Sequence, residues 1–182
     1  MIKRKMGRYL LTLLVITGLA GTIEDNTISK TERKYALTLM KDTYKEAVKA
    51  TKDLSETQLD FKAAPDKWSV KNCIYHIAAT EKMLWGMFEG AMKAPANPKK
   101  RSEIKVTDEQ VVNMIEDRSR KAQAPEAAQP KNTGYGSLDE ALADFKKTRG
   151  EHIKYMKTST ADMRNHVVQT PVGWLDCYQV YL

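Results

Sequence analysis

The chain has 182 residues, of which 42% are hydrophobic and 29% are charged, and its formal net charge is +7. A chain of this length can bury a core without disulfide support, and the composition is ordinary for a soluble globular protein. The 9 glycines, together with long stretches of apolar residues at helical spacing, favour helices over a strand-rich fold.

The first twenty residues have the layout of a secretory signal peptide. The basic head is followed by an apolar run over residues 9–19, and Gly18 and Ala20 are the small residues before a cleavage site. The run is short for a membrane span of about 20 residues, although an uncleaved N-terminal anchor is the alternative. We therefore expect a periplasmic or secreted protein with no stable membrane span after cleavage.

The signal peptide also carries most of the positive charge. It holds four basic residues and no acidic ones, so residues 21–182 have a net charge of +7 − 4 = +3. A surplus of this size does not require a nucleic-acid partner. The densest remaining group of basic residues, Lys99-Lys100-Arg101, follows Pro98 and is interpreted as a solvated loop.

Two long helices are expected in the first half of the chain after a linker over residues 21–30. Ser29 and Glu32 form a capping box for a helix that runs to about Lys52. Ser69 is the N-cap of a second helix, which continues to about Met92. Its apolar residues make one stripe at helical spacing: Val70, Cys73, Ile74, Ile77, Leu84, Trp85 and Phe88.

The second half of the chain predicts three more helices separated by loops. Thr107 caps a short helix, and Ser137 with Glu140 forms the clearest capping box, for a helix that ends near Lys157. A turn at residues 171–173 precedes a final helix, which is expected to begin near Leu175. That helix is too short to cover three long ones, so a bundle built from this chain lacks most of its fourth helix.

Several segments, taken in order, resemble the DinB/YfiT-like superfamily, in particular its DinB-like branch. The first element is Pro65-Asp66-Lys67-Trp68-Ser69-Val70 followed by His76-Ile77-Ala78-Ala79-Thr80-Glu81. Further elements are Phe145-x-x-x-Arg149 and Gly173-Trp174-Leu175-Asp176-Cys177-Tyr178-Gln179. The likeness covers nearly all of residues 31–182, which we expect to form one DinB-like domain.

The resemblance implies an all-α, up-down-down-up four-helix bundle that holds a divalent metal of the Zn, Ni or Mn type. Such proteins use three histidines, one on the second helix and a His-x-x-x-His pair on the fourth. His76 matches the first position, whereas the pair would lie beyond Leu182. We therefore expect this chain to be a fragment of the three-histidine protein and not to bind the metal tightly.

Together with the signal-peptide pattern, the resemblance suggests an exported metal-dependent enzyme of hydrolase or transferase type that acts on an unknown small molecule. Three protein ligands leave one coordination position open for water or substrate, which is typical of a catalytic site. The alternative is a non-catalytic helical binding module without the metal site. We expect no nucleic-acid partner, and an apolar seam without a covering helix favours a homodimer.

Other candidate residues are given structural roles. His152 and His166 are expected to face solvent, and Glu81 is interpreted as a solvated carboxylate or one that bonds to a loop. Cys73 and Cys177 are not expected to form a disulfide, because the implied topology separates them along the bundle axis by far more than the ~7 Å that a bridge allows between Cα atoms.

Overall fold

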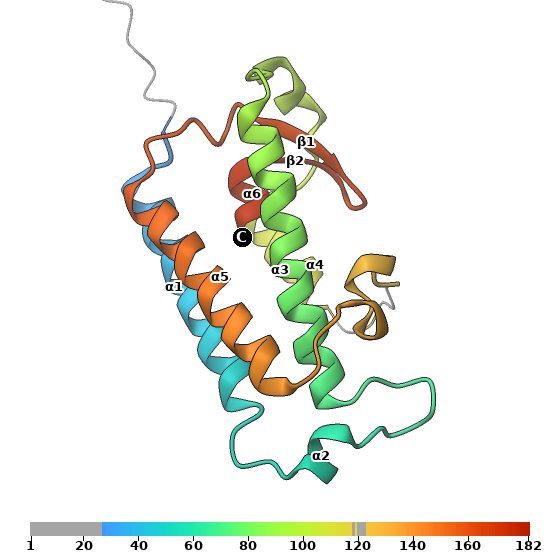
Figure 1. The fold of residues 1–182 in the computed structure, drawn as a ribbon. Coiled ribbons are helices and arrows are strands. Elements are labelled where there is room, and N and C mark those ends of the chain that lie inside the picture. The colour runs from blue at the N-terminus through green and yellow to red at the C-terminus, as the bar shows by residue number, and fades with distance from the viewer. Residues whose placement is uncertain (1–26, 118, 120–122) are drawn as a thin grey trace, which may run out of the picture.

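The structure is a computed structural model that describes residues 27–117, 119 and 123–182, so the expected signal peptide lies outside the described residues. Three long helices dominate (Figure 1), which confirms the all-α class. The elements are α1 (Lys30–Lys49), α2 (Glu56–Asp60), α3 (Val70–Lys93), η1 (Pro98–Glu103), α4 (Asp108–Glu116), η2 (Glu126–Ala128), η3 (Pro130–Asn132), α5 (Leu138–Thr158), β1 (Val167–Thr170), β2 (Gly173–Asp176) and α6 (Cys177–Tyr181). No helix in this described part of the chain is long and apolar enough to cross a membrane.

The three long helices pack in an up-down-down arrangement. Helix α5 contacts both α1 and α3, and α1 runs antiparallel to the other two (Figure 1). The short helix α6 packs against α3 near its C-terminal half. A fourth long helix, which the resemblance implies, stays a prediction.

Side-chain caps fix where the helices begin, as the sequence predicts. Ser29, Ser69 and Thr107 each accept a hydrogen bond from the backbone three residues later, and the side chain of that later residue accepts one in return. Ser137 caps α5 in the same way, but the carboxylate of Glu140 accepts the N–H of Gly136, at 2.8 Å. The capping box expected at Ser137 is therefore only half formed.

A two-stranded antiparallel hairpin replaces the expected start of the last helix. Strands β1 and β2 pair Val167 with Asp176 and Thr170 with Gly173. Gly173 has a φ of 118°, which glycine adopts without steric cost, so the strands can be joined by a two-residue turn. The final helix accordingly begins at Cys177, and the expected start near Leu175 is wrong.

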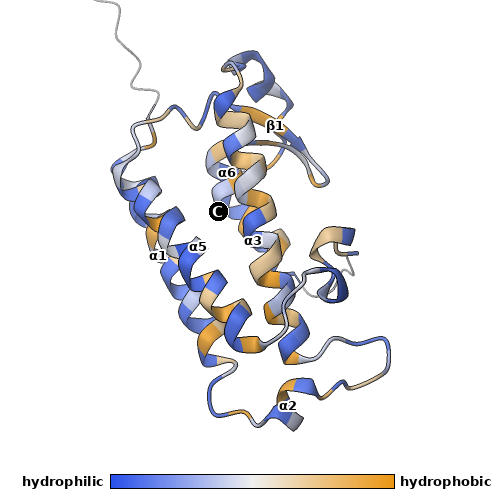
Figure 2. Ribbon diagram, viewed as in Figure 1, coloured by the Kyte–Doolittle hydropathy of each residue, from blue (hydrophilic) through white to orange (hydrophobic). Residues whose placement is uncertain are grey.

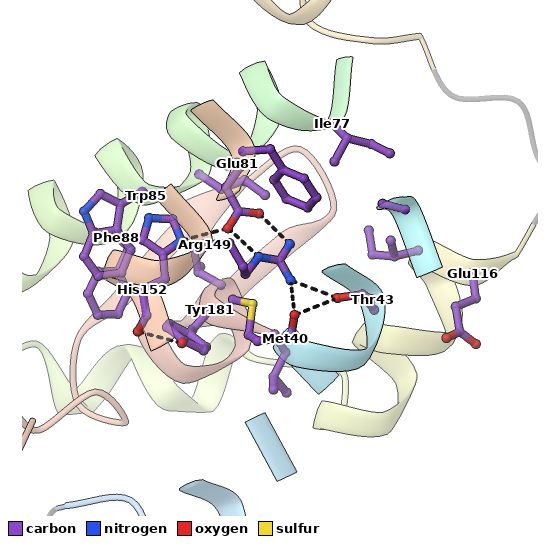
Figure 3. A pocket seen from close by; sticks show the side chains of 16 residues that line it. Met40, Thr43, Ile77, Glu81, Trp85, Phe88, Glu116, Arg149, His152 and Tyr181 are labelled. Atoms are coloured by element: carbon purple, nitrogen blue, oxygen red, sulfur yellow. Dashed lines mark hydrogen bonds and ion pairs between the residues drawn. The ribbon is translucent and has the colours of Figure 1, made fainter. Parts of the chain in front are cut away.

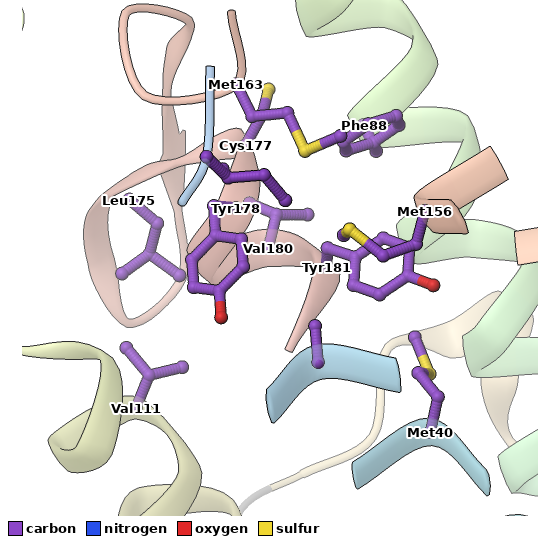
Figure 4. Packing of buried hydrophobic residues seen from close by; sticks show 12 residues of the cluster. Met40, Phe88, Val111, Met156, Met163, Leu175, Cys177, Tyr178, Val180 and Tyr181 are labelled. Atoms are coloured by element: carbon purple, nitrogen blue, oxygen red, sulfur yellow. The ribbon is translucent and has the colours of Figure 1, made fainter. Parts of the chain in front are cut away.

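The larger buried cluster lies around α6 and joins it to the long helices (Figure 4). The side chains of Phe88, Met156 and Tyr178 are almost completely buried there. Ile28, within the expected linker, is also buried in this cluster. A second, smaller cluster lies between α3 and α5 around Tyr75 and Phe145.

Arg164, in the segment between α5 and β1, ties the C-terminal part of the chain to α1 and α4. Its guanidinium pairs with Glu32, with both carboxylate oxygens of Asp108, at 3.0 and 2.6 Å, and with Asp176, at 2.9 Å. It also lies over the ring of Tyr178, 4.2 Å from the ring centroid. One half-buried cation therefore joins two helices to the base of the hairpin.

Candidate functional site

His76 lies in the second turn of α3, where two segments hold its ring in place. Trp68, just before the Ser69 N-cap, packs against the imidazole with 4.9 Å between ring centroids. Nδ1 of His76 lies 2.8 Å from the carbonyl oxygen of Ala128 in η2. The loop after α4 and the segment before α3 thus orient this half-buried side chain together.

These contacts determine which ring nitrogen of His76 carries the proton. A carbonyl oxygen can only accept a hydrogen bond, so Nδ1 must be the donor toward Ala128, and Nε2 of the neutral ring keeps its lone pair. Metal-binding histidines typically have this arrangement, with one nitrogen hydrogen-bonded to a carbonyl and the other facing the metal. The orientation of His76 is therefore compatible with a role as metal ligand.

The described residues do not complete such a site by themselves. Within residues 27–117, 119 and 123–182, no three His, Cys, Asp or Glu side chains gather closely enough to hold a metal ion. His166 is half-buried rather than facing solvent, and its Nδ1 lies 2.9 Å from the carbonyl oxygen of Ala91. Because the described residues do not complete a metal site, we derive no catalytic step through a metal.

A buried charged network includes Glu81, which lies five residues after His76 on α3. Figure 3 shows this network. The guanidinium of Arg149 donates Nε–H and Nη2–H to the two carboxylate oxygens of Glu81, at 2.7 and 2.6 Å. Its Nη1 donates to the carbonyl oxygen of Met40, at 2.9 Å, and to Oγ1 of Thr43, at 2.8 Å. Arg149 thus joins α1, α3 and α5 through one side chain.

His152 extends this network, and the expectations for His152 and Glu81 were wrong. The His152 residue is 3% exposed, and its Nδ1 lies 2.9 Å from Oε1 of Glu81. The imidazole stacks on Trp85, with 4.0 Å between ring centroids. The Glu81 side chain is only 9% exposed, so it is neither solvated nor bonded to a loop. Both residues belong to the interior because helix α5 faces α3 along this side.

The charges of the network set its protonation. Burial raises the pKa of the Glu81 carboxyl, but hydrogen bonds from His152 and Arg149 and the positive charge of Arg149 outweigh this, so its pKa lies below the ordinary value. The carboxylate is therefore ionised at neutral pH and accepts a hydrogen bond from His152 Nδ1–H. Nε2 of His152 is buried and has no hydrogen-bond partner among the described residues.

The network forms the polar part of a cavity of about 360 Å³. The rest of the cavity wall is mostly apolar, with Ile77 and Leu84 from α3 and Ile115 from α4. The side chain of Leu84 is 38% exposed and that of Ile115 is 67% exposed, so apolar surface reaches the solvent here. This is the volume range of small-molecule pockets, which are apolar with a few polar groups.

Sequence reasoning could have found the buried side of α5. Phe145, Arg149, His152 and Met156 follow one another at intervals of four, three and four residues, which places them on one helical face. Phe145 and Met156 are clearly core residues, so the two polar residues between them share their burial. The partner Glu81 lies 68 residues away from Arg149 and cannot be found from local spacing.

The fold and this site define an all-helical protein whose second long helix carries a hydrogen-bonded histidine after a Trp-Ser start. The family model of the DinB superfamily matches residues 39–182, and the chain belongs to this superfamily. The family is generally associated with metals. No curated protein and no solved structure matches the chain.

The two cysteines differ in exposure, and no disulfide joins them. Cys73 is exposed, whereas Cys177 is completely buried, and burial together with the negative charge of Asp176 raises the pKa of the Cys177 thiol to about 12. Because the thiolate is the reactive form, iodoacetamide at pH 8 should modify Cys73 and spare Cys177. Mass spectrometry should find one adduct on the native chain and two after unfolding. Similar labelling rates at both positions would contradict the packing around α6.

Proposed function

We propose that the protein is an exported, metal-dependent enzyme of the DinB type, of hydrolase or transferase class, in which His76 is one metal ligand. The observation that carries this proposal is the orientation of His76, whose Nδ1 is hydrogen-bonded to Ala128 and whose Nε2 keeps its lone pair. Membership in a family associated with metals supports it. The signal-peptide pattern of residues 1–20 supports the exported location.

If a metal is bound, the positive ion would activate water or polarise the substrate, as divalent metals do in hydrolases and transferases. The described residues themselves show only how His76 is oriented as a ligand. Trp68 and Ala128 fix the ring plane and the tautomer of His76 before any ligand arrives. Such preorganisation by outer contacts typically affects metal affinity by tenfold or more.

Metal content tests this proposal directly. In protein isolated from its own cells, elemental analysis should find a divalent metal, and His76→Ala should lose it. His166→Ala is the matched control, because His166 is also half-buried with its Nδ1 near a backbone carbonyl, and it should keep the metal.

A metal-free protein, or equal metal content in both variants, would favour the second candidate function. This is a non-catalytic helical binding module, and the cavity of about 360 Å³ is the observation that supports it. Its buried charges are already paired with one another, so its remaining wall offers mainly apolar contact.

A further inference from the structure

The structure attaches a basic segment that follows α3 to the base of the hairpin β1–β2. The four cations of this segment are Lys99, Lys100, Arg101 and Lys105, of which the first three lie on η1. We call these four residues, together with Val172 and Trp174 of the hairpin, the basic surface. Figure 2 shows the segment that follows α3 largely in hydrophilic colours.

The segment and the hairpin are held together by defined hydrogen bonds. Asn97 donates Nδ2–H to the carbonyl oxygen of Val167, at 2.9 Å, and accepts the N–H of Val167 on its Oδ1, at 2.8 Å. Nη1 of Arg101 donates to the carbonyl oxygen of Arg164, at 2.6 Å. The expected solvated loop is thus a short helical turn attached to the base of the hairpin.

The positive charge of this surface is concentrated and exposed. Residues 99–105 carry four basic side chains and one acidic one, a net charge of +3, which equals the net charge of residues 21–182. The remainder of residues 21–182 is therefore neutral on balance. Within the described residues, none of the four cations forms an ion pair with a carboxylate. Their charges are therefore not neutralised by the protein and can attract an external anion.

The hairpin attached to these cations carries an amphipathic aromatic side chain beside Lys100 and an exposed aliphatic one at its tip. Val172, in the two-residue turn of the hairpin, is 52% exposed, and Oγ1 of Thr170 accepts its N–H, at 3.2 Å. Trp174 is half-buried, and Nζ of Lys100 lies 4.7 Å from its ring centroid. The turn is therefore fixed in shape with an apolar side chain at its tip.

We propose that the basic surface binds the anionic surface of a lipid bilayer, with Val172 entering the headgroup region. This combination places lysines at lipid phosphates, a tryptophan at the interface and an aliphatic side chain deeper. Single-stranded nucleic acid would use an aromatic face for base stacking, but Lys100 already covers the Trp174 ring. This binding is independent of any metal at His76.

A fluorophore placed at the tip of the hairpin tests the proposal locally. The full chain with Cys73→Ser and Val172→Cys is labelled with bimane and mixed with vesicles of equal phosphatidylcholine and phosphatidylglycerol. The emission should shift to the blue, and lipids with spin-labelled acyl chains should quench it. A label at Thr38→Cys, an exposed position on α1, should show neither effect. Because the readout is local, binding through residues 1–20 alone would leave the label at position 172 in water.

Charge reversal tests the contribution of the cations. Lys99→Glu, Lys100→Glu and Lys105→Glu together should weaken vesicle binding by about 100-fold, since each lysine near an anionic membrane contributes about fivefold. The matched control makes the same change of charge at exposed lysines in and just after α1: Lys34→Glu, Lys41→Glu and Lys52→Glu. It should weaken binding by only a few fold, and both triple variants should melt as the parent does.

Three results would overturn the proposal: no blue shift at position 172, equal binding to pure phosphatidylcholine vesicles, or equal losses in the two triple variants. Tight binding of a single-stranded oligonucleotide that the first triple variant abolishes, without any shift at position 172, would assign the basic surface to nucleic acid instead.

Discussion

Replacing Arg149 by methionine should lower the free energy of unfolding by about 3–5 kcal/mol. Glu81, whose side chain is 9% exposed, would lose both charged hydrogen bonds from the guanidinium. The carbonyl oxygen of Met40 and Oγ1 of Thr43 would lose a donor at the same time. The loss is large because the buried carboxylate would keep only its hydrogen bond with His152, and burying a charge without its cation costs far more than an ion pair gains.

Urea unfolding followed by circular dichroism at pH 7 measures this effect. Lys45→Met is the control, because the Lys45–Asp42 pair is well exposed, and it should change the unfolding free energy by less than about 0.5 kcal/mol. Replacing both Glu81 and Arg149 by leucine should cost less than the sum of the single replacements. A loss below about 1 kcal/mol for Arg149→Met would show that the network does not stabilise the fold.

The ion pair between Glu81 and Arg149 also predicts how the free energy of unfolding depends on pH. The pKa of Glu81 in the folded protein lies below its unfolded value of about 4.3. The ionised carboxylate therefore contributes its full stabilisation of the fold above that value, and this stabilisation is lost as the pH falls through the folded pKa. The difference in stability between the parent and Arg149→Met should therefore shrink between pH 7 and pH 3. A difference that stayed constant over this range would contradict the assignment.

Arg164→Met should be the second most damaging replacement, with a loss of about 2–4 kcal/mol. Asp176, whose side chain is 3% exposed, would keep a buried negative charge without its cation. Glu32 and Asp108 are about one-third exposed, so water can solvate their carboxylates in part once the guanidinium is gone. The cost should therefore come mainly from Asp176.

A second replacement separates this cause from a loss of packing. Asp176→Asn removes the charge but keeps an oxygen that can accept the N–H of Gln179 and cap α6. Added to Arg164→Met, it should recover part of the lost stability in the same urea experiment. If the double variant is as unstable as Arg164→Met, or less stable, then the contacts of the guanidinium with Tyr178 matter more than the charges.

Features that depend on neighbours in sequence could be predicted, and those that depend on distant partners could not. The caps at Ser29, Ser69 and Thr107 need only a residue three positions on, so their spacing identifies them. Strand β1 has four residues, too few for a periodic pattern to distinguish it from a loop. The turn at residues 171–173 was expected, but no pattern on either side of it indicated that the flanking residues pair as strands.

The candidate site shows the same division. His76 was chosen as a candidate metal ligand because its Trp-Ser context resembles that of the family. The tautomer could not be predicted, because Ala128, the carbonyl that fixes it, lies 52 residues away in an irregular segment. His152 was misplaced because single histidines on mostly polar helices usually face water, and its partner Glu81 was itself expected in solvent.

The contacts of the first turn of α1 have a consequence for the order of events during synthesis. Arg33 donates to the carbonyl oxygens of Met156 and Ser159, and the backbone carbonyl of Glu32 accepts the hydroxyl of Tyr178, which lies 146 residues later. At about 5–20 residues per second, the ribosome needs roughly 7–30 s to add those residues. The start of α1 must therefore wait for these native partners. During that interval Ile28 and Met40 cannot reach the core cluster that they join in the folded protein.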